Sequence, residues 1–401
     1  MLRMSVASLR RSGAVRWWPI AIDNCRARRD NAPPQSVATI WLLLLFLLMC
    51  PGNAPAVAQG RTTVTAGLEA GERIDFFTTA AHLSADGKTW NIPIHGRVFR
   101  PENSIVRKAI IARALKSGFG IEADRASQLL FDQRINLLLG DNKGNREITV
   151  QIAGRSIVLP RSGADGHFNG EISIPVADLA AATASGRLDF SAQMKTRDAR
   201  TYSGTVLLVP RQGYSIISDI DDTVKITNVL DRKRMLEATF TKPFEAVPGL
   251  ARLYQTWGSE GAALHFVSTC PWHLYEPIAT FLQEAGFPAA TIAMKKIRLT
   301  DRSVLDLFAD ATRIKPPEIE ALLKAHPERT FVLIGDSGEK DPEIYADTLR
   351  RYPTRIARIF IRNVTGTTAD DPRFVKVFAG IDRDRWQLFA NPDELPRKLR
   401  E

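Results

Sequence analysis

From Tyr214 onward the chain alternates short, strongly apolar runs with segments of helical periodicity. The apolar runs are "YSIISDI" (214–220), "ALHFVSTC" (263–270), "RTFVLIGD" (329–336) and "TRIARIFIRNV" (354–364). Amphipathic stretches such as "PWHLYEPIATFLQEAGFP" and "DPEIYADTLRRYP" separate them. Strands that alternate with helices predict a parallel, doubly wound sheet with helices on both faces. In such sheets ligands bind beyond the carboxyl ends of the strands.

Polar clusters follow three of these predicted strands. They read "SDIDDT" (218–223), "STC" (268–270) and "GDSGEKD" (335–341). Asp219 and Asp221 are two positions apart, so both side chains are expected on the same side of the strand end. Neighbouring carboxylates repel, and a proton, a cation or a metal must relieve the repulsion. With Asp336 and Asp341 added, the oxygen-rich set suits Mg²⁺.

A hard divalent ion beside a carboxylate is typical of phosphoryl transfer. One aspartate can act as the nucleophile, and a second carboxylate two positions later can act as general acid and base. Ser268, which ends the second strand, and Lys315, which is expected to open a later helix, could bind phosphoryl oxygens.

Alternatives stay open for several of these residues. The acidic cluster could be an acidic loop or a structural Ca²⁺ site, and Asp341 could cap the following helix. Lys324 and Lys340 compete with Lys315 for the role of the phosphate-binding lysine. Asp222 is expected to be a helix cap or a surface residue.

These motifs carry a resemblance. "DIDDT" is similar to the first motif of the haloacid dehalogenase superfamily (D-x-D-x-T), and Ser268, Lys315 and "GDSGEKD" follow in the order of its other motifs. "SDIDDTVKIT", "HFVSTCPWHLY", "RLTDRSVLDLF" and "FVLIGDSGEKDPEIY" together resemble the catalytic domain of the actin-patch-type phosphatidate phosphatases and their bacterial relatives. The resemblance runs from about Ser215 to Leu395.

The resemblance implies a haloacid-dehalogenase type of α/β sheet and a role for each matching residue. Asp219 would be the nucleophile, Asp221 the general acid and base, and Thr223 a support for the loop at the phosphate site. Ser268 and Lys315 would hold phosphate. Mg²⁺ would be held by Asp219, Asp221 through its backbone carbonyl, Asp336 and Asp341. Thr269 and Cys270 stand where relatives often have Asn-Ser.

The stretch before the α/β pattern has a different rhythm. Period-two alternation, as in "NIPIHGRVF" (91–99) and "GHFNGEISIP" (166–175), predicts antiparallel strands in a β-rich, sandwich-like domain. One segment, 103–120, has helical spacing, with Asn103 or Ser104 as its cap and Gly118 or Gly120 as its stop. We therefore divide the chain into a segment 1–58, a β-rich domain 59–210 and a phosphatase-like domain 211–401.

Residues 1–58 resemble a signal peptide with a long basic n-region. The uncharged run Ser36–Cys50 is short for a membrane span, and an A-x-A pattern ends at Ala58. We expect cleavage before Gln59 and a periplasmic or extracytoplasmic location; retention as a membrane anchor through residues 36–50 is the alternative. The net charge of +10 is not gathered into a basic stripe with interleaved aromatics, so a nucleic-acid partner is not expected.

The sequence thus predicts an exported, Mg²⁺-dependent phosphatase for phosphate monoesters. The leading substrate is phosphatidate or a related lipid phosphate, with peripheral membrane contact as a further expectation. The alternatives are a phosphatase for a non-lipid monoester, or an envelope lipid-binding protein with a vestigial hydrolase domain.

Overall fold

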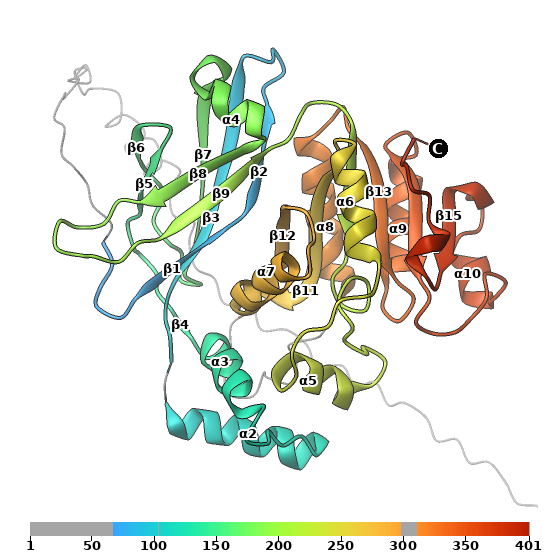
Figure 1. The fold of residues 1–401 in the computed structure, drawn as a ribbon, viewed down its shortest axis with the longest axis horizontal. Coiled ribbons are helices and arrows are strands. Elements are labelled where there is room, and N and C mark those ends of the chain that lie inside the picture. Colours follow the sequence, from blue (N-terminus) through green and yellow to red (C-terminus); the bar gives the residue numbers. More distant parts are fainter. Residues whose placement is uncertain (1–66, 103, 298–310, 401) are drawn as a thin grey trace, which may run out of the picture. The chain divides into compact units, whose positions relative to one another are not determined.

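The computed structural model describes residues 67–102, 104–297 and 311–400 (Figure 1). The predicted signal segment and the stretch 298–308, which carries one of the quoted motifs, lie outside the described residues. Within these ranges, no helix has both the length and the apolar character needed to cross a bilayer.

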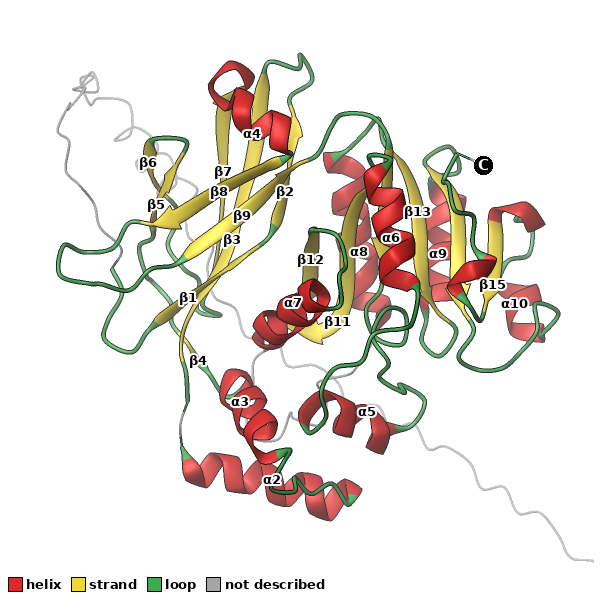
Figure 2. Cartoon of the chain, viewed as in Figure 1, coloured by secondary structure: helices red, strands yellow, loops and turns green. Residues whose placement is uncertain are grey.

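A nine-stranded, mostly antiparallel sheet occupies residues 73–208 (Figure 2). Its long strand β3 (Thr89–Arg100) pairs with four other strands, β1, β2, β4 and β7. Both halves of the sheet contribute to one buried apolar cluster, with Ile92 from β3, Val150 from β5 and Phe190 from β8. This confirms the predicted β-rich, sandwich-like region. The other strands and short helices are β1 (Arg73–Phe77), β2 (Thr79–Leu83), β4 (Asp141–Asn142), β5 (Thr149–Ile152), β6 (Arg155–Val158), β7 (His167–Pro175), η2 (Val176–Leu179), α4 (Ala180–Ser185), β8 (Arg187–Ala192) and β9 (Ser203–Leu208).

Two helices interrupt the β-rich region between β3 and β4. The first, α2 (Ile105–Phe119), is the predicted helical insert. Of the proposed boundaries, the structure selects Ser104 as the cap, whose Oγ accepts from the backbone N–H of Arg107 at 3.3 Å, and Gly120 as the stop, with φ of +64°. A side chain other than glycine rarely adopts that left-handed conformation. The second helix, α3 (Gln128–Leu138), was not predicted.

A six-stranded sheet, parallel throughout, follows from Tyr214 onward. Its spatial order is β12-β11-β10-β13-β14-β15, so the strands stand in the order third, second, first, fourth, fifth and sixth along the chain. This confirms the predicted doubly wound sheet, although strand β15 was not predicted. The strands are β10 (Tyr214–Ser218), β11 (Ala263–Pro271), β12 (Ala290–Lys295), β13 (Thr330–Asp336), β14 (Ile356–Arg362) and β15 (Trp386–Phe389).

Helices cover both faces of this sheet because consecutive strand residues point in opposite directions. Ile216 packs in one buried cluster with residues of α6 and α7, and Ile217 packs in another with residues of α8, α9 and α10. The helix predicted to open at Lys315 begins earlier, at Ala311, so Lys315 lies in its second turn. The helices are α5 (Arg232–Phe240), α6 (Leu250–Ser259), η3 (Trp272–Leu274), α7 (Tyr275–Glu284), α8 (Ala311–Ala325), α9 (Asp341–Arg351), α10 (Pro372–Val377), η5 (Arg383–Arg385) and η6 (Pro392–Glu394).

Aromatic side chains join the β-rich region to the end of strand β11. The Phe77 ring of β1 lies 4.0 Å, centroid to centroid, from the Trp272 ring. The hydroxyl of Tyr275 accepts from the backbone N–H of Thr78 at 2.9 Å. Trp272, which lies two residues after the "STC" cluster, therefore packs in a buried aromatic group.

One buried arginine fixes the connection between the two sheets. Arg329, just before β13, donates to the carbonyls of Pro210 at 2.7 Å and Gln212 at 2.6 Å and to Ser215 Oγ at 2.8 Å. It also contacts the Tyr214 carbonyl. Because Arg329 is almost fully buried, water cannot replace these hydrogen bonds if the guanidinium is removed.

We predict that Arg329→Met lowers the free energy of unfolding by about 3 kcal/mol, because it leaves buried carbonyl oxygens without donors. Urea denaturation of the variant and the parent protein measures this change. The matched control is Arg252→Met, since the Arg252 side chain is 79% exposed and should contribute less than about 0.5 kcal/mol. Equal midpoints for the two variants would contradict the assignment.

Candidate active site

The predicted site residues gather where the sheet reverses its winding direction. Strands β10 and β13 are adjacent in the sheet, but the chain proceeds from β10 toward one edge and from β13 toward the other. Crevices form at such a point beyond the carboxyl ends of the strands. Asp219 follows β10, Asp336 ends β13, and the Asp219 backbone N–H donates to the carbonyl of Ile334 at 2.9 Å.

Asp219 is a buried carboxylate paired with a buried lysine. Its Oδ1 lies 2.9 Å from Lys315 Nζ, and its Oδ2 accepts from Thr223 Oγ1 at 3.3 Å. Burial raises the pKa of Asp219 to about 7; Lys315 opposes the rise, and the charges of Glu339 and Asp221 add to it. A positive charge in addition to Lys315 would therefore be needed next to Asp219 to keep it fully ionised near neutral pH.

Asp221 has a different set of partners. Its Oδ1 lies 2.6 Å from Lys225 Nζ and accepts from Thr227 Oγ1 at 2.7 Å, and its Oδ2 accepts from Ser268 Oγ at 3.4 Å. Burial alone would raise the pKa of Asp221, but Lys225 and the Thr227 hydrogen bond outweigh it and lower the pKa. The environments of Asp219 and Asp221 thus push their two pKa values apart.

Asp222 is neither a helix cap nor a surface residue, so that expectation was wrong. Its side chain is buried and accepts from the backbone N–H groups of Thr227 at 2.7 Å, Asn228 at 2.8 Å and Val229 at 2.6 Å. Its φ of +53° turns the chain after Asp221. Asp222 therefore organises the loop that carries Asp219 and Asp221.

The end of strand β11 contributes Ser268. The Ser268 side chain is buried, and its Oγ accepts from the backbone N–H of Cys270 at 3.0 Å while it faces Asp221. Burial raises the pKa of the Cys270 thiol, so this side chain stays protonated. Ser268 therefore belongs to the group of polar side chains around Asp221, and Cys270 is not an activated nucleophile.

Lys315 contacts more acidic groups than any of the competing lysines. Its buried Nζ pairs with Asp219 and Asp341 and lies 3.4 Å from Glu339 Oε2. Burial would lower the pKa of Lys315, but these three carboxylates raise it well above its usual value. Lys324 and Lys340 are instead exposed and lie 3.8 Å from the surface carboxylates of Glu320 and Glu343.

Asp341 is held against strand β13. Besides its contact with Lys315, its Oδ2 accepts from the backbone N–H of Asp336 at 3.2 Å. Residue 335 must be glycine for this approach, because a Cβ there would lie 2.6 Å from the Asp341 Cβ. Asp341 is also the first residue of α9, but its side chain faces the site.

Three acidic side chains could share one cation. Asp219, Asp336 and Glu339 each offer a carboxylate oxygen within 4.8 Å of the others. Asp336 Oδ1 accepts from the N–H groups of Gly338 at 2.6 Å and Glu339 at 3.1 Å, whereas its buried Oδ2 has no hydrogen-bond partner among the described residues. Burial and the charges of Asp341 and Asp219 raise the pKa of Asp336 well above its usual value.

This donor set fits a hard divalent cation such as Mg²⁺, because it offers only oxygens and has an orphaned acceptor. Glu339 was not among the predicted ligands, although it lies within the quoted "GDSGEKD" cluster. Asp341, a predicted ligand, has both oxygens engaged, one by Lys315 and one by the Asp336 N–H. The side chain of Asp221 faces Lys225.

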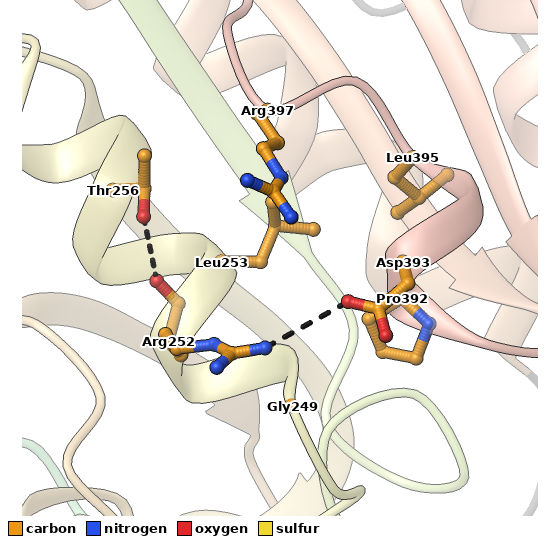
Figure 3. Close-up of a pocket in the computed structure, with 8 residues that line it drawn as sticks. All are labelled: Gly249, Arg252, Leu253, Thr256, Pro392, Asp393, Leu395 and Arg397. Carbon is orange, nitrogen blue, oxygen red and sulfur yellow. Dashed lines mark hydrogen bonds and ion pairs between the residues drawn. The ribbon is translucent and has the colours of Figure 1, made fainter.

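A separate cavity of about 310 Å³ lies between α6 and the C-terminal segment (Figure 3). Its acidic residue, Asp393, pairs with Arg252 at 3.8 Å, and both side chains are exposed. None of the carboxylates described above lines it. The lining residues are Gly249, Arg252, Leu253, Thr256, Pro392, Asp393, Leu395 and Arg397.

Comparisons with known proteins agree with the resemblance seen in the sequence. Residues 214–363 match the family model described as phosphatidate phosphatase APP1, catalytic domain. An uncharacterized protein of Schizosaccharomyces pombe is 33% identical over 168 residues, which are 41% of this chain and 27% of the relative. Phosphatidate phosphatase APP1 of Saccharomyces cerevisiae is 31% identical over 164 residues, 40% of this chain and 27% of that protein.

The chain thus spans about a quarter of the length of these curated relatives. Among solved structures, a putative HAD-like phosphatase from Mesorhizobium loti aligns with a TM-score of 0.29 and 13% identity over 47% of this chain and 84% of that chain. The family-model match covers β10 to β14 and includes every carboxylate of the cluster.

We predict that Mg²⁺ raises the thermal unfolding temperature, because a cation bound only by the folded protein stabilises it. At about one hundred times the dissociation constant the gain is about 2.7 kcal/mol. Differential scanning fluorimetry of Glu339→Gln should show most of this shift lost, whereas Asp347→Asn, an exposed change on α9, should keep it. An undiminished shift in Glu339→Gln would exclude Glu339 as a ligand.

Proposed function

We propose that the chain is a Mg²⁺-dependent phosphatase for phosphate monoesters, on the premise that residues 214–363 form a catalytic domain of the phosphatidate phosphatase type. The observation that carries the proposal is the environment of Asp219. This buried carboxylate stands at the end of β10, 2.9 Å from a buried lysine and close to the carboxylate oxygens of Asp336 and Glu339. An acidic surface loop would have no reason to bury these groups together.

In the proposed reaction an Asp219 oxygen attacks the phosphorus atom and the ester P–O bond breaks. The leaving alkoxide takes a proton from Asp221. A water molecule then attacks the aspartyl-phosphate, returns a proton to Asp221 and releases inorganic phosphate. Asp219, Asp336 and Glu339 would hold the Mg²⁺, which when bound neutralises negative charge on the phosphate group.

The other residues of the site would bind and orient the phosphate. The Lys315 ammonium, already within 2.9 Å of Asp219, would interact with a phosphoryl oxygen next to the nucleophile. Ser268 Oγ and the Thr223 hydroxyl lie beside Asp221 and Asp219 respectively, where they can donate hydrogen bonds. Asp341 would keep Lys315 in position from the opposite side.

The proton-donor role of Asp221 requires a change of partner. A general acid must carry a proton, but Lys225 and Thr227 hold the pKa of Asp221 down. Substrate binding must therefore weaken the ion pair between Asp221 and Lys225 so that the carboxyl group can take up a proton and reach the leaving oxygen. While the ion pair with Lys225 is intact, Asp221 stays ionised, and the ionised carboxylate is the form that activates water in the second step.

Phosphatidate, or a related lipid phosphate, is the substrate class that we propose. The name of the budding-yeast relative supports this class. The segment between Ser268 and Lys315 also contains α7 and β12, which leaves little chain for a large lid over the site. A site without a large lid would suit a substrate whose remainder stays in a membrane.

We also propose that this reaction takes place outside the cytoplasm. The support is the amino-acid pattern of residues 1–58 alone, in which a basic region precedes an uncharged run and an A-x-A ending.

We predict that the protein releases phosphate from phosphatidate in mixed micelles in the presence of Mg²⁺. A chelator should abolish the release, and Asp219→Asn should lower it at least about a thousandfold because the amide is not a nucleophile. Asp222 is unsuitable as a control because it organises the loop; Asp347→Asn, which is exposed, should keep parental activity.

An aryl phosphate separates the two parts of the proposal. Cleavage of the aryl phosphate without phosphate release from phosphatidate would refute the lipid substrate and keep the phosphatase activity. Failure with both substrates, in protein whose thermal unfolding still responds to Mg²⁺, would refute the phosphatase itself.

We further predict that Lys225→Met moves the alkaline limb of the pH–rate profile to higher pH. Lys225 lowers the pKa of Asp221, so without it Asp221 stays protonated to a higher pH and remains a competent acid. Lys324→Met, at an exposed lysine of α8, should leave the profile unchanged. An unmoved limb in Lys225→Met would contradict the role of Asp221 as proton donor.

A further inference from the structure

Large aliphatic side chains are exposed on one group of helices. In α2, Ile105, Val106 and Ile110 are 80%, 69% and 59% exposed. Leu129 of α3 and Leu230, just before α5, are also largely exposed. Within the described ranges, these five residues make up most of the large apolar side chains that are strongly exposed. Clustered exposure of this kind marks an interaction surface rather than ordinary scatter.

The same surface is basic. Helix α2 contains four cations, Arg107, Lys108, Arg113 and Lys116, and no acidic residue. Two of them pair with carboxylates that flank the helix, Arg107 with Glu102 and Lys116 with Glu122. Arg113 and Lys116 are also exposed, in the turns that follow the aliphatic residues. Exposed aliphatic side chains beside lysine and arginine fit the interface of an anionic membrane, where apolar groups enter the headgroup region and cations meet lipid phosphates.

A second basic segment adjoins α2. Residues Arg232, Lys233 and Arg234 form the exposed first turn of α5, and Leu230 precedes them. The Arg232 guanidinium lies 5.2 Å from the centre of the Phe119 ring at the end of α2. The exposed leucine and the cations of α5 therefore continue the surface of α2.

These helices lie beyond the carboxyl ends of the parallel strands, as does the carboxylate cluster. Ile111 of α2 and Phe131 of α3 share a buried cluster with Met235 and Phe240 of α5, and Ile297, just after β12, packs against it. Helix α3 also contacts η3, which directly follows β11. In Figure 1, α2, α3 and α5 lie together at the end toward which the arrowhead of β11 points.

We propose that α2 and the start of α5 form a docking surface for an anionic phospholipid bilayer. The surface would insert Ile105, Val106 and Ile110 between lipid headgroups while Arg113 and Lys116 contact lipid phosphates. Docking in this way turns the carboxyl-end side of the sheet toward the membrane. The inference deepens the proposed lipid phosphatase function and rests on it for its biological purpose, but the docking itself does not require hydrolysis.

Two other binding partners, a second copy of the chain and its own residues 1–58, fit the positive charge of this surface less well. A two-fold contact between copies would bring the cations of α2 against the same cations of the second α2, and only the flanking Glu102 and Glu122 of each copy would offset them. Residues 1–58 contain seven arginines and two aspartates, so that segment is also cationic. An anionic lipid surface complements both the charge and the aliphatic side chains.

Site-specific thiol protection tests the proposal on the full chain. The measurement reports on one labelled position, so membrane binding through residues 1–58 does not replace the signal from α2. Val106→Cys is placed in a Cys25→Ser/Cys50→Ser background, in which the remaining Cys270 is buried. The rate of labelling by a polar maleimide is measured without vesicles, with phosphatidylcholine vesicles and with vesicles that also contain phosphatidylglycerol. The matched control is Val375→Cys on α10, where the parent valine is 57% exposed.

We expect anionic vesicles to slow the labelling of residue 106 by at least about tenfold, and salt to reverse the effect. The labelling of residue 375 should not change. Adding Ile105→Gln, Ile110→Gln and Arg113→Gln should remove the protection while hydrolysis of a soluble aryl phosphate stays at the parental rate. Because these vesicles contain no phosphate monoester, the result does not depend on the proposed reaction.

Three outcomes would overturn the proposal. Labelling of residue 106 could be unaffected by anionic vesicles. Protection could be equal on neutral vesicles and insensitive to salt, which would show that the surface does not recognise anionic lipid. Protection could also appear without vesicles and grow with protein concentration, which would show that a second copy covers the surface.

Discussion

The ammonium group of Lys315 is the interaction on which the site depends. It comes from α8 on one face of the parallel sheet and reaches carboxylates beyond two strands, Asp219 after β10 and Asp341 after β13. Without it, the acidic groups of this crevice would repel one another in a region from which water is largely excluded. The second relief for that repulsion would be a cation among Asp219, Asp336 and Glu339. One positive charge is thus built into the fold, and the other would be supplied by the solution.

The rest of the molecule holds these strand ends in place. Asp222 gathers three backbone N–H groups and shapes the loop that carries Asp219 and Asp221. Gly335 lets Asp341 approach the backbone of β13. The β-rich region supplies none of the clustered carboxylates; it packs Phe77 against Trp272, directly beyond the strand that carries Ser268. Its contribution is therefore to support the end of β11.

The sequence predicted the parts of the site that follow from strand position, and it could not predict those that depend on how loops close. The apolar runs before Asp219 and Asp336 locate both residues at strand ends, and strand ends of a doubly wound sheet meet at one place. Glu339 and the partnership of Asp221 with Lys225 depend on loop conformation, which no periodicity encodes. Helix α3 and strand β15 were missed for a related reason, because short elements stabilised by tertiary packing leave weak patterns. Lys315 was predicted at a helix start, and two prolines follow it; proline is common in the first turn of a helix. In the structure Pro316 and Pro317 fall inside the helix, so Lys315 lies in its second turn.

The position of α2 and α3 in the chain allows their surface and the acidic cluster to change independently during evolution. These helices are an insertion between two β-strands, well before the segment 214–363 that carries the carboxylates. Mutations that alter the exposed side chains of α2 leave every residue of the parallel sheet intact. A lineage could therefore exchange the proposed docking surface while it inherits the acidic cluster unchanged, and homologues with the same cluster could differ through this one insertion in the surfaces that they bind.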